Sequence, residues 1–185
     1  MNTNLNTSVQ GVVVSPKQAT QVGDVVETII EEALEYARLR ISTIRQPQDL
    51  DILFQQHDFL CTFKYGLADG IGQALGLYDE NVLATYVFEP CLNPDIETGE
   101  EIPTDSTINL ILLVSSPTAG LEAFIASLDR ALTQRLKELP FAPLAAFNSV
   151  LNTILVTKKD LEQGKGYAAL ITSIYTPPIK IWQRL

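Results

Sequence analysis

Cysteine, histidine and basic residues are all scarce in this chain of 185 residues. Two cysteines cannot supply the disulfide framework on which small secreted domains depend. A single histidine excludes a metal site with two imidazole ligands. The 13 lysines and arginines are outnumbered by 22 aspartates and glutamates, which leaves a formal net charge of −9. Because nucleic-acid-binding domains normally carry a basic excess, we expect no nucleic-acid partner.

Long apolar runs and a high density of charge are also missing. Charged residues make up 19% of the chain and apolar residues 46%, the reverse of the balance in disordered proteins, so we expect a folded domain with one sizeable core. The longest uncharged stretches, 106–121 and 139–157, both contain proline and several polar residues, and neither predicts a membrane-spanning helix. The N-terminus lacks the apolar run of a signal peptide. We therefore expect a cytoplasmic protein without membrane contact.

Helical periodicity marks four segments, which we predict to be helices: 24–44, 48–57, 58–78 and 117–139. Asp24 and Glu27 resemble a capping box at the start of the first helix, and Ser116 is the expected N-cap of the last. Residues 1–20 are polar and predict an N-terminal tail. Residues 21–185 contain neither a repeat nor a linker and predict a single domain.

β-Branched and aromatic residues mark four strands, the last of them a short edge strand: 82–89, 108–114, 150–156 and 179–182. Between the last two strands we predict a capped helical turn, a glycine break and a further helix at 157–163, 164–166 and 167–175. This order predicts an α+β fold in which helices pack on one face of a small, mostly antiparallel sheet. A crossover through 117–139 would add a parallel pair and make the sheet mixed.

Three glycines suggest a cofactor site. Gly66, Gly70 and Gly72 follow the strand-like sequence DFLCTFKY, and Glu89 closes the next predicted strand. This arrangement over 59–89 resembles the GxxxGxG turn of short-chain dehydrogenases. In that turn the backbone approaches a pyrophosphate and an acidic residue binds the ribose hydroxyls. The resemblance implies a nucleotide-binding enzyme. However, no tyrosine here is followed four residues later by lysine, so the catalytic pair of that family is absent.

The same glycines have a structural interpretation, which we prefer. Gly66 and Gly70, like Gly72 and Gly76, are spaced four residues apart, and this spacing opens a helix face to close packing. No GxSxG, HExxH, phosphate-loop or CxxC motif occurs. His57 and Cys61 could pair on a helix, but the apolar neighbours of Cys61 indicate burial rather than a reactive thiolate. We therefore predict no catalytic residue, no cofactor and no metal.

Acidic residues dominate the middle of the sequence. Between Lys64 and Arg130 there is no base but there are eleven acids, five of them in one long loop. An EF-hand frame over 93–104 would need glycine and glutamate where the chain has Thr98 and Thr104, so we interpret the loop as a solvated turn. Hydroxyls at Ser115, Ser116 and Thr118 could hold an anion or cap the next helix, and we prefer the cap.

The C-terminal segment combines bases with apolar anchors. Residues 158–185 have a net charge of +3, whereas the rest of the chain has −12. We predict that this segment packs against the 24–44 helix or its copy in a second subunit, where its bases would meet Glu31 and Glu35, with Tyr167, Tyr175 and Trp182 as interaction residues.

Two functions are compatible with these features. The first is a non-catalytic interaction or regulatory domain, homo-oligomeric or bound to another protein. The second is a small-ligand or nucleotide-binding enzyme that uses the turn at 66–72 and Glu89. The absence of a convergent catalytic set favours the first.

Overall fold

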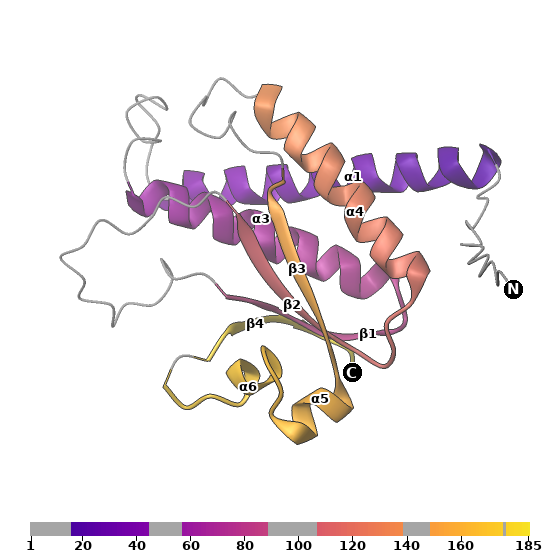
Figure 1. The fold of residues 1–185 in the computed structure, drawn as a ribbon. Helices are drawn as coiled ribbons and strands as arrows, with labels where there is room; N and C mark the ends of the chain where they lie inside the picture. The colour runs from indigo at the N-terminus through magenta and orange to yellow at the C-terminus, as the bar shows by residue number, and fades with distance from the viewer. Residues whose placement is uncertain (1–15, 45–56, 89–106, 139–148, 176) are drawn as a thin grey trace, which may run out of the picture.

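Three long helices and a four-stranded sheet are the main elements of the structure, a computed structural model (Figure 1). It describes five stretches of the chain: 16–44, 57–88, 107–138, 149–175 and 177–185. The side chains at 16–21, 40–44 and 57–61 lie outside this description. The fold is α+β with a mixed sheet, as the sequence predicts.

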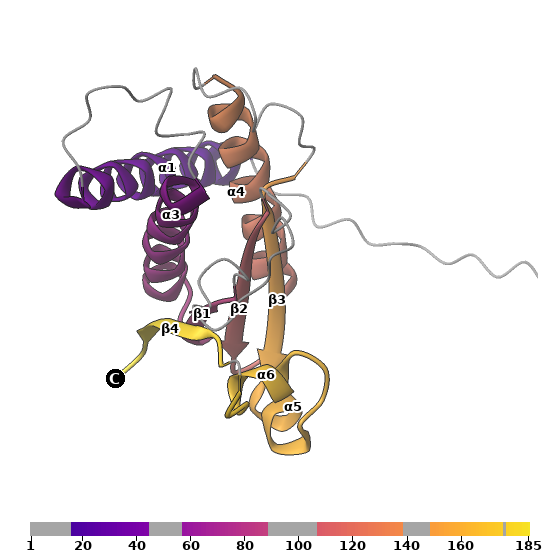
Figure 2. The same cartoon turned by 90° about the vertical axis from the view of Figure 1, so that its left-hand side faces the viewer.

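The elements form layers. The helices are α1 (Pro16–Ile44), α3 (His57–Tyr78), α4 (Ala119–Glu138), α5 (Lys158–Gln163) and α6 (Ala168–Ile171). The strands are β1 (Val82–Val87), β2 (Ile108–Val114), β3 (Leu151–Thr157) and β4 (Ile179–Gln183). Helices α1, α3 and α4 cover one face of the sheet, and the short α5 and α6 lie on its other side (Figures 1 and 2).

The strand order in the sheet is β3-β2-β1-β4. Strand β1 pairs antiparallel with β2 on one side and with β4 on the other. Strands β2 and β3 are parallel and are joined through α4, so the predicted crossover is confirmed. Consequently β3 and β4 are the two edges of the sheet.

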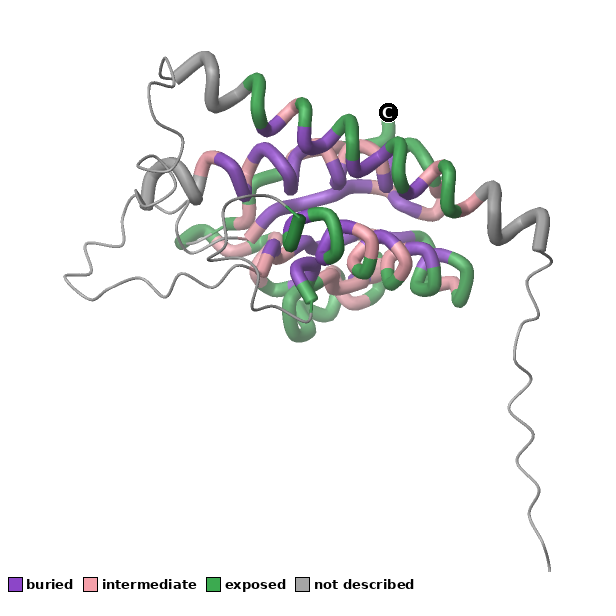
Figure 3. The backbone as a smooth tube through the Cα atoms, turned by 90° about the horizontal axis from the view of Figure 1, so that it is seen from above, coloured by how far each residue is buried: buried purple, intermediate pink, exposed green. Residues whose placement is uncertain are grey.

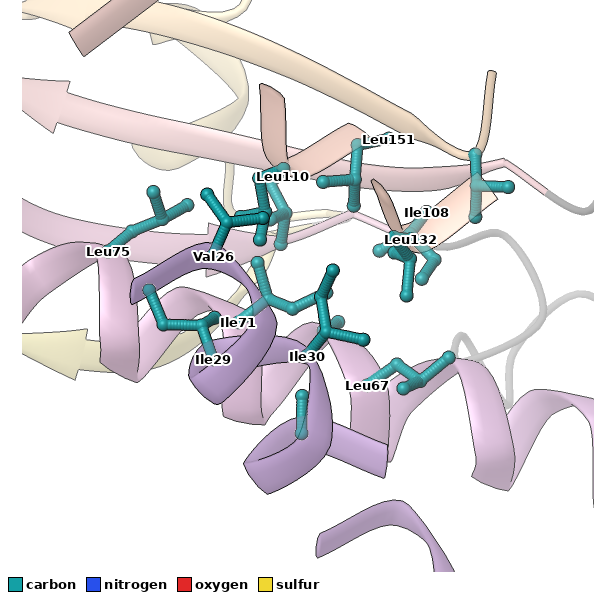
Figure 4. Packing of buried hydrophobic residues seen from close by; sticks show 14 of the residues in the cluster. Val26, Ile29, Ile30, Leu67, Ile71, Leu75, Ile108, Leu110, Leu132 and Leu151 are labelled. Atoms are coloured by element: carbon teal, nitrogen blue, oxygen red, sulfur yellow. The ribbon is translucent and has the colours of Figure 1, made fainter. Parts of the chain in front are cut away.

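The main core lies between the three long helices and the sheet (Figure 4). Its largest fully buried side chains include Ile30 of α1, Ile71 of α3, Leu110 of β2 and Leu132 of α4. Seen from above, the buried residues of α1 lie on one side of the helix and the exposed ones on the opposite side (Figure 3). This is the packing expected when apolar residues recur at helical spacing, because such a helix buries one face.

A smaller cluster occupies the other face of the sheet. Side chains alternate along a strand, so Ile111 of β2 and Val156 of β3 point away from the long helices. There they pack with Tyr86 of β1 and with Ala168 of α6.

Helix and strand boundaries agree with the sequence to within two residues for α3, α4 and all four strands. The predicted helix at 48–57, apart from its last residue, lies outside the described residues, as does most of the predicted tail. The glycine break is confirmed, because Gly164 ends α5 in the left-handed conformation with φ of 58°.

Three local predictions were wrong. Helix α1 begins at Pro16, a residue favoured at the first helical position, so the predicted helix start at Asp24 is incorrect. Helix α4 is capped not by Ser116 but by Thr118, whose hydroxyl accepts a hydrogen bond from the Leu121 N–H at 3.2 Å. The predicted helix at 167–175 is only the four residues of α6, since the hydrogen bonds around it, such as that from the Leu170 N–H to the Tyr167 carbonyl, span three residues, a pattern found only in short runs.

Asp129 of α4 ties the helix layer to the start of β3. One carboxylate oxygen accepts hydrogen bonds from the backbone N–H groups of Val150 and Leu151, both at 2.8 Å. We expect Asp129→Asn to lower the free energy of unfolding by about 1–2 kcal/mol, because hydrogen bonds to a charged acceptor are stronger than those to a neutral one. Urea denaturation measures this effect.

The matched control is Glu138→Gln, which removes an exposed carboxylate at the end of the same helix. We expect this change to stay within about 0.5 kcal/mol. Equal stability of the Asp129 variant and the parent protein would contradict the anchoring role.

Candidate functional site

The glycines predicted as a cofactor turn lie inside helix α3. Gly66 and Gly70 face α1, where a Cβ atom added to either would lie 2.8 Å from the Cα atom of Ala37 or Ala33. Only residues without a side chain fit such a distance, because the opposing atoms belong to the backbone. These two glycines therefore allow α1 and α3 to pack closely.

The second glycine pair faces the sheet. A Cβ atom at Gly72 would collide with the side chain of Ile181, and one at Gly76 would collide with the ring of Trp182. All four glycines are thus covered by neighbouring elements, and the segment before them is helix rather than strand. Glu89 lies outside the described residues. Nucleotide binding at this segment stays a prediction, to be tested by titration with NAD and NADP.

Trp182 is one of the three predicted interaction residues, and it packs within the chain. Its ring is half-buried on Gly76, and the Arg184 guanidinium lies over it at 5.3 Å from the ring centre. The same guanidinium donates hydrogen bonds to the carbonyls of Gly76 at 2.7 Å and Asp79 at 3.1 Å. These carbonyls lie in the last turn of α3 and just beyond it, where the helix has no further N–H groups to donate to them. The C-terminus thereby caps α3.

Tyr167 and Tyr175 are exposed, in contrast to Trp182. The exposed fractions are 47% for Tyr167 and 84% for both Ile174 and Tyr175, and Ile179 at the start of β4 is 39% exposed. We call these four residues the C-terminal apolar surface. They are half of the exposed large apolar side chains among the described residues, although 167–179 is a small part of the chain.

A charged groove of about 520 Å³ runs between α1 and α4. Its walls carry Glu31, Glu35 and Arg38 from α1 and Arg135 and Glu138 from α4. Arg135 lies 3.8 Å from Glu31 and 3.6 Å from Glu138, and all these groups are largely exposed. The groove thus contains acids and bases that already pair with each other.

The expected pairing of Glu31 with the C-terminal bases is therefore incorrect within one chain. Glu31 meets Arg135 of α4, and β4 packs on β1 and α3. The reason is the long-range geometry: the short β4 completes the sheet edge below α3, a position that the charge pattern of the sequence does not reveal. Contact of the segment with α1 of a second copy stays a prediction.

The hydroxyl cluster before α4 forms local hydrogen bonds. The Ser115 hydroxyl donates to the Asn81 side-chain oxygen at 2.8 Å, and Thr118 caps α4. Ser116 is exposed. The first turn of α4 carries Glu122, an acid that opposes anion binding there.

One buried polar cluster escaped the sequence analysis. Asp69 of α3 is 6% exposed and accepts hydrogen bonds from the Tyr36 hydroxyl at 2.7 Å and the Gln73 amide at 2.8 Å. The sequence signal that could have predicted this cluster is the single acid, Asp69, within a glycine-rich and otherwise apolar stretch of α3. With both carboxylate oxygens satisfied, this cluster joins α1 to α3 and offers no free group for chemistry.

Two further findings bear on the function. Among the residues whose side chains are described, no three or more histidine, cysteine or acidic side chains are grouped closely enough to hold a metal ion. No helix in the described stretches is both long and apolar enough to cross a membrane. The side chains of His57, Cys61 and Cys91 lie outside the description.

A reciprocal capping box starts α5 and lowers the pKa of a partly buried acid, Asp160. The Thr157 hydroxyl and backbone N–H both donate to the Asp160 carboxylate, and nearby Lys165 and Lys159 favour the same charged form. These interactions hold the pKa of Asp160 below its ordinary value. A carboxylate whose pKa is lowered by folding stabilises the fold above its unfolded pKa, and this contribution is lost as the pH falls through the folded pKa.

We therefore expect Thr157→Val to raise the pKa of Asp160 toward its ordinary value, because the largest of these interactions, the hydroxyl hydrogen bond, is removed. An NMR titration of the Asp160 carboxyl in both proteins measures the shift. Identical midpoints would contradict the capping-box account.

Comparison with protein-family models, with curated proteins and with solved structures finds no match to this chain.

Proposed function

We propose that this chain is a non-catalytic interaction domain of the cytoplasm that acts as a homo-oligomer. The observation that carries the proposal is the C-terminal apolar surface, Tyr167, Ile174, Tyr175 and Ile179. The exposure of these tyrosine and isoleucine side chains to water is unfavourable, so their burial against a partner would stabilise a complex. Aromatic residues of this kind commonly form the centre of protein interfaces.

Charge supports a second copy as the partner. The segment that carries the surface, 158–185, has a net charge of +3, and the remainder of the chain has −12. A positive segment on one copy is attracted to the negative body of another, which favours their encounter. In a homo-oligomer, the positive segment of each copy can contact the negative body of another, so no different protein is needed as the partner.

The test replaces the two most exposed residues of the surface. We expect the double variant Ile174→Ser, Tyr175→Ser to weaken self-association at least tenfold in sedimentation velocity over a range of concentrations. Its fold should stay intact, because both side chains are 84% exposed. The matched control is Leu77→Ser, which removes a 76% exposed apolar side chain at the end of α3. Association of the double variant equal to that of the parent would contradict this use of the surface.

A nucleotide-binding enzyme is the second candidate, and it rests on the resemblance of 66–72 to a dinucleotide turn. The packing of all four α3 glycines against neighbouring elements speaks against it, because a bound pyrophosphate needs the space that these elements fill. Micromolar binding of NAD or NADP in calorimetry would reverse this preference.

A further inference from the structure

The two edges of the sheet differ in how they are protected. Strand β4 is short, carries Lys180 as its second residue and is paired with β1 through a bulge, three features that discourage further strand pairing. Strand β3 has seven residues, LNTILVT, without a charge or a proline. Its pairing with β2 runs without a shift over all seven residues. One edge is thus blocked, whereas the other is regular and uncharged.

Hydrogen bonds at the start of β3 show which backbone groups point outward. The Val150 carbonyl accepts from the Ile108 N–H of β2 at 2.6 Å, so this carbonyl points inward, whereas the Val150 N–H donates to Asp129. Successive residues of a strand direct these groups to opposite edges. The groups of Leu151, Thr153, Leu155 and Thr157 therefore point away from β2, toward the free edge.

Side chains of the same copy bind the outward N–H groups at both ends of β3. Asp129 accepts from the Leu151 N–H at 2.8 Å, and Asp160 accepts from the Thr157 N–H at 3.0 Å. At the centre, Thr153 and Leu155 have outward N–H groups for which the described residues provide no acceptor. Such groups form the template on which another strand can pair.

We infer that β3 pairs with β3 of a second copy, antiparallel and about a two-fold axis at Ile154. This inference rests on the homo-oligomer proposed above, but not on the C-terminal apolar surface. Thr153 of one copy faces Leu155 of the other only when the axis lies at Ile154, the residue between them in the strand. In that register Thr153 of one copy and Leu155 of the other exchange both of their outward hydrogen bonds. Two four-stranded sheets then become one continuous sheet of eight strands.

The occupant is a second copy because β3 is complementary to itself. No like charges face each other within the strand, since it carries none. Thr157 of one copy would lie opposite Leu151 of the second copy, whose N–H group is bound by Asp129. Lys158, the first residue of α5, directly follows Thr157, so the base of one copy lies near that carboxylate of the other. Arg130, the neighbouring base, instead points along α4 to the Ser127 hydroxyl at 3.3 Å.

A cysteine at the two-fold axis tests the register. In an antiparallel pair, residues at a non-hydrogen-bonded position have Cα atoms about 4.5 Å apart, which permits a disulfide. We expect Ile154→Cys to give a covalent dimer under mild oxidation, with the 154–154 link identified by mass spectrometry without reduction. Asn152→Cys is the matched control on the same face of β3, because its two copies would lie about 13 Å apart along the strands. Equal cross-linking of the two variants would overturn the register.

A proline at the edge tests the hydrogen bonds directly. The Thr153 N–H points outward, so Thr153→Pro removes it without deleting a bond to β2. We expect this variant to associate at least tenfold more weakly in sedimentation velocity. Thr153→Val keeps the N–H and removes only a buried hydroxyl without a partner among the described residues, so we expect it to associate like the parent.

The outcomes separate this inference from the proposed function. If the parent associates but Ile154→Cys forms no 154–154 link, the β3 contact is wrong and the homo-oligomer stands. If the link forms and the variant of Ile174 and Tyr175 associates like the parent, the β3 contact stands and the C-terminal apolar surface is not an interface. A monomeric parent at all concentrations overturns both.

Discussion

Gly70→Ala is expected to lower the free energy of unfolding by about 2 kcal/mol. In a solvent-exposed helix the same change would be favourable by up to about 1 kcal/mol, because alanine is the better helix former. At Gly70 the new methyl group would lie 2.8 Å from the Cα atom of Ala33, so α1 and α3 must move apart. Overpacking of this kind typically costs about 1–3 kcal/mol.

Gly23→Ala provides the matched comparison. Gly23 lies in α1, and an added Cβ atom would meet nothing within 4 Å. We therefore expect this variant to be more stable than the parent, so the two alanine substitutions have opposite signs. Urea denaturation of the three proteins measures both effects. A stabilising Gly70→Ala would contradict the assignment of the α3 glycines to helix packing.

Trp182→Ala is expected to cost about 3 kcal/mol, the largest effect of any single change considered. Truncation of a large aromatic side chain in a core typically costs about 3–5 kcal/mol, and Trp182 is only half-buried, which places it at the low end. The change also uncovers Gly76 and removes the ring beneath Arg184, the residue that caps α3.

Tyr175→Ala is the control for Trp182→Ala, because it removes an aromatic ring from the same C-terminal segment at 84% exposure. We expect it to change stability by less than about 0.5 kcal/mol. Thermal and urea unfolding should therefore show a clearly lower stability for Trp182→Ala than for Tyr175→Ala. Equal stability of both would mean that Trp182 does not hold β4 on α3.

Local sequence patterns were sufficient to predict most of the elements. The β-branched and apolar run at 108–114 and the helical spacing of apolar residues over 58–78 and 117–139 are strong local signals, so the predicted elements match β2, α3 and α4 closely. The helix start at Pro16 was missed because the polar residues that follow it carry little apolar periodicity. The short α6 was overestimated because apolar spacing continues beyond the turn that ends it.

The candidate surfaces depended on long-range geometry that local patterns do not contain. The spacing of the α3 glycines indicated two packing faces, but not that one faces α1 and the other faces β4. Nor could the sequence distinguish Trp182, which packs within the chain, from Tyr175, which is exposed, because both lie in similar apolar surroundings. The unprotected edge at β3 followed only from the strand order.

Native mass spectrometry of the full chain, purified without added ligand, tests the central claim most directly. It reports the number of subunits and any retained small molecule in one measurement. A homo-oligomer built on a two-fold β3 contact predicts an even multiple of the 20.4 kDa chain mass, with no additional bound mass. A 20.4 kDa monomer that carries a bound dinucleotide would contradict it and favour the enzyme.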